Sequence, residues 1–177
     1  MDNLHKSSSH IQAKAEEVIF SQIEKLFNIR FEKNKKLYLA DNAFTYMQPD
    51  FYSEEQLIVG EIFAHIGKPK KAQDNKVAND ILKMLLLEKI TGKQYRKIVV
   101  VCDTTEKKKL EGKSVLAESI RQFGIEILYI EIDTNMKQQI MDAQELQKMT
   151  TQLYLSNTIW TEDMTNRNVW KPIEVFI

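Results

Sequence analysis

Apolar residues recur every three or four positions near the start of the chain, which is the spacing of one buried helical stripe. The residues of this stripe are Ile11, Ala15, Val18, Ile19, Ile23, Leu26 and Phe27. The pattern predicts a helix over about 9–28. Three short extended segments follow at 36–39, 43–49 and 56–66, with polar residues between them. Segments of this length, divided by turns, predict an antiparallel meander.

A longer apolar pattern covers residues 71–91, and its leucine and isoleucine positions predict a helix that is buried on several sides. Gly92 suits the C-terminal cap of this helix, because glycine adopts the left-handed conformation without strain. Residues 97–102 are rich in β-branched side chains, as in an interior strand that is buried on both faces. The predicted sheet therefore continues through this segment.

Further along, the pattern predicts a helix over 105–123, weakened by Gly112, then a strand over 126–132 and a helix over 136–150. Residues 153–177 show no clean period. Helices and strands that alternate in this order predict an α/β sandwich with a mixed sheet.

The composition is that of a folded globular protein. The 177 residues are 43% hydrophobic and 28% charged, and this length predicts one domain, with a core over about 9–103 and an extension over about 104–177. The longest apolar run, Ile98 to Cys102, is too short to cross a bilayer, so no membrane span is expected. Because Cys102 is the only cysteine and no apolar leader precedes the first helix, we expect a cytoplasmic protein.

Charge is balanced over the chain but not along it. Residues 68–97 contain nine bases and three acids, whereas residues 125–163 contain two bases and seven acids. This asymmetry is compatible with a polyanion that docks on one side of the molecule, although lysines on exposed helix faces are commonly just solubilising.

Two acidic residues fall where the predicted strands meet. Side chains alternate between the faces of a strand, so Val59, Glu61 and Phe63 share one side. A carboxylate among apolar neighbours is unfavourable unless it is paired, hydrogen-bonded or bound to metal. Asp50 follows Pro49 and lies ten intervening residues before Glu61, a distance that a hairpin closes. Two carboxylates that converge at the end of a sheet suit a hard, oxygen-seeking ion such as magnesium.

These residues, and the order helix, three strands, helix, strand, resemble the PD-(D/E)XK nuclease superfamily, which has the restriction-endonuclease-like fold. The likeness covers the chain from about Ser9 to Asp103. Pro49-Asp50 resembles the first motif element and Glu61 the second. The resemblance implies that Asp50, Glu61 and the backbone carbonyl of Ile62 hold Mg²⁺, or Mn²⁺ in its place. It further implies hydrolysis of phosphodiester bonds in DNA, and a homodimer, since many such enzymes cut both strands.

The lysine of the motif is missing two residues after Glu61, where the chain has Phe63. An aromatic ring neither orients a water molecule nor carries charge. Some members of the superfamily supply this lysine from the following helix, and here that helix places four polar residues within one sector of about 80°. They are Gln73, Lys76, Asp80 and Lys83. We expect Lys76 to be the displaced lysine, with Gln73 beside it and Lys70 or Lys83 as alternatives.

The first helix adds a further acid by the same resemblance, because members of the superfamily often carry a glutamate there. Glu16 borders the apolar stripe, whereas Glu17 points away from it, so Glu16 is the expected site residue. His65 shares the predicted face of Glu61 and is a further candidate contact for metal, water or phosphate.

Other interpretations of the same residues stay open. Pro49-Asp50 is also an ordinary turn dipeptide, and Lys76 is also an ordinary surface lysine. A second hypothesis is therefore a catalytically inactive nuclease-fold protein that binds nucleic acid or a protein partner. A third is phosphotransfer through Asp103 at the end of a buried strand, although Asp103 also suits the cap of the next helix. Cys102 has the pattern of a small buried hydrophobe.

Overall fold

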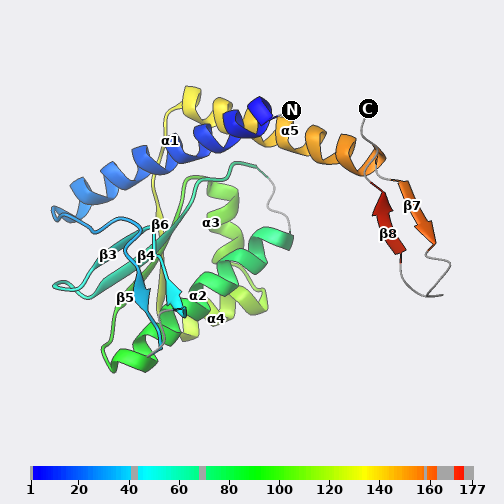
Figure 1. The fold of residues 1–177 in the computed structure, drawn as a ribbon. Helices are drawn as coiled ribbons and strands as arrows, with labels where there is room; N and C mark the ends of the chain where they lie inside the picture. Colours follow the sequence, from blue (N-terminus) through cyan, green and yellow to red (C-terminus); the bar gives the residue numbers. More distant parts are fainter. Residues whose placement is uncertain (1, 41–43, 68–70, 158, 163–169, 174–177) are drawn as a thin grey trace.

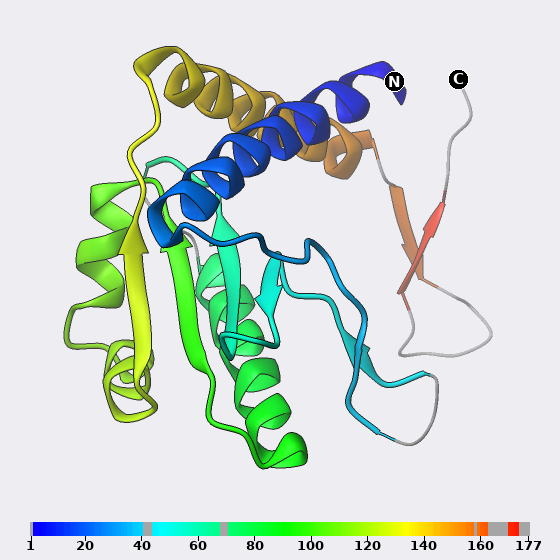
Figure 2. The ribbon, with the colours of Figure 1, turned by 90° about the vertical axis from the view of Figure 1, so that its left-hand side faces the viewer.

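The computed structural model describes residues 2–40, 44–67, 71–157, 159–162 and 170–173. Helices cover both faces of a central four-stranded sheet (Figures 1 and 2). The helices on one face are α1 (Asp2–Phe27) and α5 (Thr134–Asn157). Those on the other face are α2 (Lys71–Thr91), α3 (Thr104–Leu110) and α4 (Val115–Gln122). The α/β class is therefore confirmed.

The central sheet has the strand order β3-β4-β5-β6. The bounds of these strands are Phe51–Ser53, Ile58–Phe63, Arg96–Val101 and Ile125–Tyr129. β3 runs antiparallel to β4, whereas β4, β5 and β6 are parallel, so the sheet is mixed as predicted. The register sets Phe51 opposite Gly60, which brings Asp50, the residue before β3, to the level of Glu61.

Alternate residues of β4 enter two separate hydrophobic layers. Ile58 and Ile62 pack against α1 and α5. Val59 and Phe63 pack against α2. Glu61 stands between Val59 and Phe63 on the same face of the strand, so its side chain enters the α2 layer.

The predicted three-stranded meander is partly wrong. The first two segments pair with each other as the hairpin β1 (Leu37–Tyr38) and β2 (Tyr46–Met47), which forms a sheet of its own (Figure 2). The antiparallel partner of β4 is β3, where the sequence predicts a turn. Phe51 and Tyr52 are both buried, and their burial makes this short segment a strand.

The helix predicted over 105–123 is also interrupted. It forms two helices, α3 and α4, and the break lies around Gly112. The guanidinium of Arg121 donates hydrogen bonds to the backbone carbonyls of Glu111 and Gly112, which satisfies carbonyl groups at the end of α3.

Helix α2 spans 71–91 as predicted, but it is buried on one side only. The large apolar residues that remain exposed on it are Leu82, Leu86 and Ile90. The C-terminal stretch without a clean period contains the end of α5 and an antiparallel hairpin. The strands of this hairpin are β7 (Ile159–Glu162) and β8 (Trp170–Ile173).

Two predicted helix caps are confirmed. Gly92 ends α2 with a φ of 65°, the left-handed conformation that favours glycine. Asp103 is the N-cap of α3, and its carboxylate accepts hydrogen bonds from the backbone amides of Thr105, Glu106 and Gly67. Because backbone amides occupy both of its oxygens, the structure lends no support to a phosphoacceptor role for Asp103.

Cys102 follows β5 and is fully buried. Burial raises the pKa of its thiol to about 11, so at neutral pH the side chain is a neutral apolar group, as predicted. Within the described part of the chain, none of the helices combines the length and the apolar character that crossing a bilayer requires.

Candidate active site

The structure brings Asp50 and Glu61 together at the β3 side of the central sheet. Oδ2 of Asp50 accepts a hydrogen bond from the backbone N–H of Ile62 at 2.6 Å. The side chains of Asp50 and Glu61 interact, because each changes the pKa of the other. The two acids therefore form a pair.

Burial governs the electrostatics of this pair. Glu61 is 5% exposed, and burial, followed by the negative charges of Asp50 and Asp80, raises the pKa of Glu61 to about 9. Burial also raises the pKa of Asp50, although the Ile62 N–H and the positive charge of Lys76 oppose this rise. At neutral pH the Glu61 carboxyl therefore keeps its proton.

Lys76 brings an ammonium group to the pair. It lies in the second turn of α2, and its side chain is 56% exposed. Its Nζ is 4.4 Å from the centroid of the Phe63 ring and 3.9 Å from Oδ2 of Asp80. Its positive charge lowers the pKa of both Asp50 and Glu61. The helix that the sequence analysis proposed thus places a lysine beside the two acids.

Glu16 approaches the same place from the opposite layer. It lies on α1, is half-buried, and accepts a hydrogen bond from Nε2 of Gln12 at 3.2 Å. Burial, followed by the charge of Asp50, raises the pKa of Glu16, whereas Lys76 lowers it. Glu17 is exposed. Glu16 is therefore an acid of α1 that interacts with the carboxyl pair.

The other sequence candidates lie around this centre. Gln73 is half-buried in the first turn of α2, and His65 is half-buried beyond the end of β4. Lys83 forms an ion pair within α2, because its Nζ is 2.7 Å from Oδ1 of Asp80. Lys70 lies outside the described residues.

No family model, curated protein or solved structure matches this chain. Any function of this chain therefore has to be argued from the geometry of the described residues. The resemblance to the PD-(D/E)XK nucleases stays a hypothesis.

Asp80 belongs to this cluster, although the sequence analysis nominated it for no role. It is 3% exposed on α2, and its Oδ2 has no hydrogen-bond partner among the described residues. Its charge raises the pKa of Glu61. One signal was present in the sequence, because Asp80 shares the helical sector of Lys76 and borders the apolar stripe of the helix. Its burial and its contact with both lysines required the structure.

A divalent cation such as Mg²⁺ requires several oxygen ligands. Among the described residues, no three or more His, Cys, Asp or Glu side chains are gathered into a metal site. Two interacting carboxyl groups are present, Asp50 and Glu61, and each changes the pKa of the other. The N–H and C=O groups of one strand residue point to the same side, so the Ile62 carbonyl faces the side of Asp50. Two carboxylates and a carbonyl fit Mg²⁺, which usually keeps several waters.

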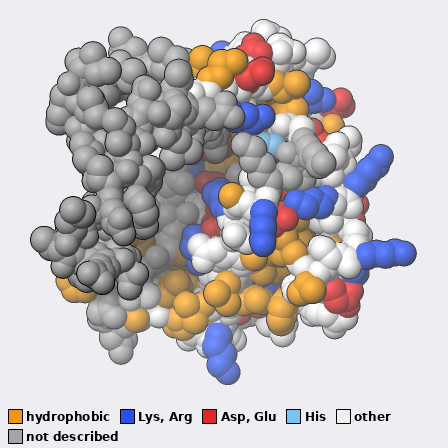
Figure 3. Space-filling view, turned by 90° about the vertical axis from the view of Figure 1, so that its right-hand side faces the viewer, with side chains coloured by type: hydrophobic (Ala, Val, Ile, Leu, Met, Phe, Trp, Pro, Cys, Tyr) orange, Lys and Arg blue, Asp and Glu red, His pale blue; other side chains and the backbone are white. Residues whose placement is uncertain are grey.

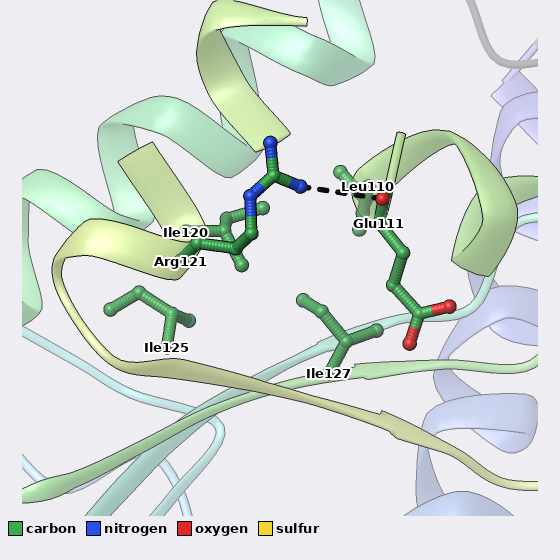
Figure 4. Close-up of a pocket in the computed structure, with 6 residues that line it drawn as sticks. All are labelled: Leu110, Glu111, Ile120, Arg121, Ile125 and Ile127. Atoms are coloured by element: carbon green, nitrogen blue, oxygen red, sulfur yellow. Dashed lines mark hydrogen bonds between the residues drawn. The ribbon is translucent and has the colours of Figure 1, made fainter. Parts of the chain in front are cut away.

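The site is separate from two cavities that the described residues form. One cavity, of about 200 Å³, lies between α3, α4 and β6 (Figure 4). Its lining is mostly isoleucine and leucine, and Arg121 and Glu111 are the charged residues among those that line it. The other lies at the C-terminal end of α1. Figure 3 shows that, on the face it presents, the coloured Lys and Arg side chains are spread among acidic and apolar ones.

Proposed function

We propose that the chain is a magnesium-dependent DNA endonuclease that hydrolyses phosphodiester bonds in the manner of the PD-(D/E)XK nucleases. The observation that carries the proposal is the buried pair Asp50 and Glu61, which the register of β3 and β4 sets level with each other, with the Lys76 ammonium beside it. A structural ion pair would match each buried acid with a base, whereas here two acids face one another in an apolar layer. Such arrangements are typical of functional sites.

Each residue has a distinct part in the proposal. Asp50, Glu61 and the Ile62 carbonyl would hold Mg²⁺, with Mn²⁺ as a substitute. When bound, the ion stabilises charge on the phosphate oxygens and lowers the pKa of a bound water. The Lys76 ammonium orients the attacking water and stabilises the hydroxide that forms from it. Glu16 adds negative charge to the ion site from α1.

The arrangement of elements supports the same proposal. Helix α1, strands β3 and β4, helix α2 and strand β5 follow one another in the order of the restriction-endonuclease-like core, although the hairpin β1–β2 forms a separate sheet. Glu61 lies on β4, and Asp50 lies directly before β3. We further propose a cytoplasmic setting and a homodimer that cuts both strands. These two points rest on the single thiol and on the resemblance, respectively.

The proposal is tested by cleavage of supercoiled plasmid DNA with Mg²⁺ and with EDTA. Asp50→Asn and Glu61→Gln keep the size of each side chain but remove the charge that holds the ion. We expect each to lower the nicking rate by at least roughly a hundredfold. Glu55→Gln, an exposed acid in the turn before β4, is the matched control and keeps the wild-type rate.

Nicking that persists at the wild-type rate in both site variants would exclude this function. Phe63 at the lysine position favours the second hypothesis, an inactive protein that binds nucleic acid or a protein partner. That hypothesis predicts DNA binding that is indifferent to Mg²⁺ and leaves no product, which a gel-shift experiment with and without EDTA distinguishes.

A further inference from the structure

Phe63 occupies the strand position at which the motif has a lysine, and its ring contacts the lysine of the following helix. The side chain is buried in the α2 layer, two residues after Glu61. The Nζ of Lys76 is 4.4 Å from the ring centroid. Among the lysine–ring contacts of the described residues this is the shortest, since the others measure 4.7 to 5.2 Å.

Asp80 bounds the same ammonium on another side. It lies one helical turn after Lys76, and its Oδ2 is 3.9 Å from the Lys76 Nζ. Its other oxygen is bound by Lys83 at 2.7 Å. Oδ2 has no hydrogen-bond partner among the described residues, so Lys76 is the nearby cation left to balance it.

We propose that Phe63 and Asp80 are positioning residues that hold the Lys76 ammonium beside the Asp50–Glu61 pair. This inference rests on the proposed function, which it extends by two residues. The negative face of an aromatic ring attracts an ammonium group, and a carboxylate attracts it from a second direction. Together they restrict a long, flexible side chain that would otherwise sample many rotamers in water.

The same contact explains why a phenylalanine can stand at the lysine position. A lysine on β4 would reach the carboxyl pair from within the sheet. A lysine on α2 has to cross from the helix, and the ring at position 63 fills the vacated space and presents a surface on which the ammonium rests. The substitution and the displaced lysine are therefore two parts of one arrangement.

The first test is spectroscopic and independent of activity. The ring current of Phe63 shifts the proton resonances of the Lys76 Cε group upfield in an NMR spectrum of the full chain. Phe63→Leu abolishes this shift, and Phe63→Tyr, which keeps the ring, retains it. The matched control is Tyr46→Leu, which removes the ring under Lys36 and leaves the Lys76 resonances unchanged.

The second test is kinetic. Phe63→Leu and Asp80→Asn each lower kcat for plasmid nicking by roughly five- to tenfold with little change in KM, because each removes one restraint on the ammonium. Phe63→Tyr restores most of the rate. Lys76→Met removes the ammonium, and adding Phe63→Lys to it returns a lysine to the strand and recovers activity.

The outcomes of these tests distinguish the positioning role of Phe63 and Asp80 from the proposed nuclease function. A Lys76 resonance that keeps its position in Phe63→Leu overturns the positioning role, whatever the activity. Unchanged kcat in both Phe63→Leu and Asp80→Asn also overturns it. If the wild-type chain makes no product while the resonances behave as expected, the placement of Lys76 stands and the proposed nuclease function fails.

Discussion

The proton on the Asp50–Glu61 pair links this site to the stability of the fold. In an unfolded chain the Glu61 carboxyl has a pKa near 4.5, whereas burial beside Asp50 raises the pKa in the folded protein to about 9. Between these values the unfolded chain has released a proton that the folded protein still holds. Stability therefore falls as the pH rises through this window.

Glu61→Gln removes this pH dependence, because the amide has nothing to ionise. In the absence of divalent ions we expect Glu61→Gln to raise the free energy of unfolding relative to wild type, on the order of 3 kcal/mol at pH 7. The gain shrinks as the pH falls and vanishes below the unfolded pKa of 4.5, where the wild-type side chain is protonated in both states. Thermal unfolding between about pH 4 and pH 9 measures the difference.

The exposed Glu55→Gln is the control for this experiment and follows the wild-type curve at every pH. Parallel melting curves for wild type and Glu61→Gln would show that the Glu61 carboxyl titrates as it does in water, which would remove the electrostatic basis of the site.

At the scale of single residues, the alternation along the strand, the polar sector of the following helix and the resemblance to the PD-(D/E)XK nucleases were together enough to propose Asp50, Glu61 and Lys76. Their roles remain predictions, but the structure does bring them together. The parts played by Phe63 and Asp80 could not be derived in the same way, because they depend on the distance between a strand and the helix packed over it. A pattern along the chain carries no information about that distance.

At the scale of elements, the hairpin β3–β4 depends on a glycine. A Cβ atom at position 60 would lie 2.1 Å from Cζ of Phe51, and Phe51 is fully buried. The Phe51 ring and the backbone of β4 have no space to move apart without disturbing the packing around them. The absence of a side chain at Gly60 is thus what allows β3 to lie against β4 with its phenylalanine inside.

Gly60→Ala should therefore destabilise the protein by about 2 kcal/mol or more. Urea unfolding followed by circular dichroism measures the loss. Phe51→Leu shortens the side chain that the new methyl group would meet, so the double variant should be less destabilised than the sum of the two single changes. Strictly additive effects would show that the close approach of Phe51 to Gly60 is not the cause.

The length of an element decided how well its sequence predicted it. Helix α2 is long enough for the spacing of its apolar residues to repeat over several turns, and its bounds agree with that pattern. β3 has three residues, too few for an alternation to show, and its identity as a strand comes from the burial of its aromatic residues against distant parts of the chain. The break at Gly112 was signalled by the glycine, although it was placed within one helix.

At the scale of the whole molecule, the carboxyl pair draws on both layers of the sandwich. Lys76 comes from α2 on one face of the sheet and Glu16 from α1 on the other. Between them, Glu61 lies on β4 and Asp50 directly before β3. The layers could be predicted from alternating helices and strands. The convergence of Lys76 and Glu16 on the carboxyl pair could not be predicted, because it depends on how α1 and α2 are placed on the two faces of the sheet.

The single thiol reports on the integrity of this sandwich. Cys102 is fully buried and its thiol has a raised pKa, so both access and thiolate formation are suppressed in the folded protein. We expect no reaction with Ellman's reagent at pH 8 until denaturant unfolds the chain, with the thiol signal and the circular dichroism signal rising together. Rapid labelling of the native protein would contradict the described packing of β5.

The burial of Cys102 makes the protein suitable for labelling at one chosen position. A cysteine introduced at an exposed position, such as Val115, would be the sole point at which a maleimide dye attaches under native conditions. Pairs of such positions would then report nanometre distances by energy transfer without any background from the native sequence, so the approach of a fluorescent oligonucleotide to each edge of the sheet could be followed molecule by molecule.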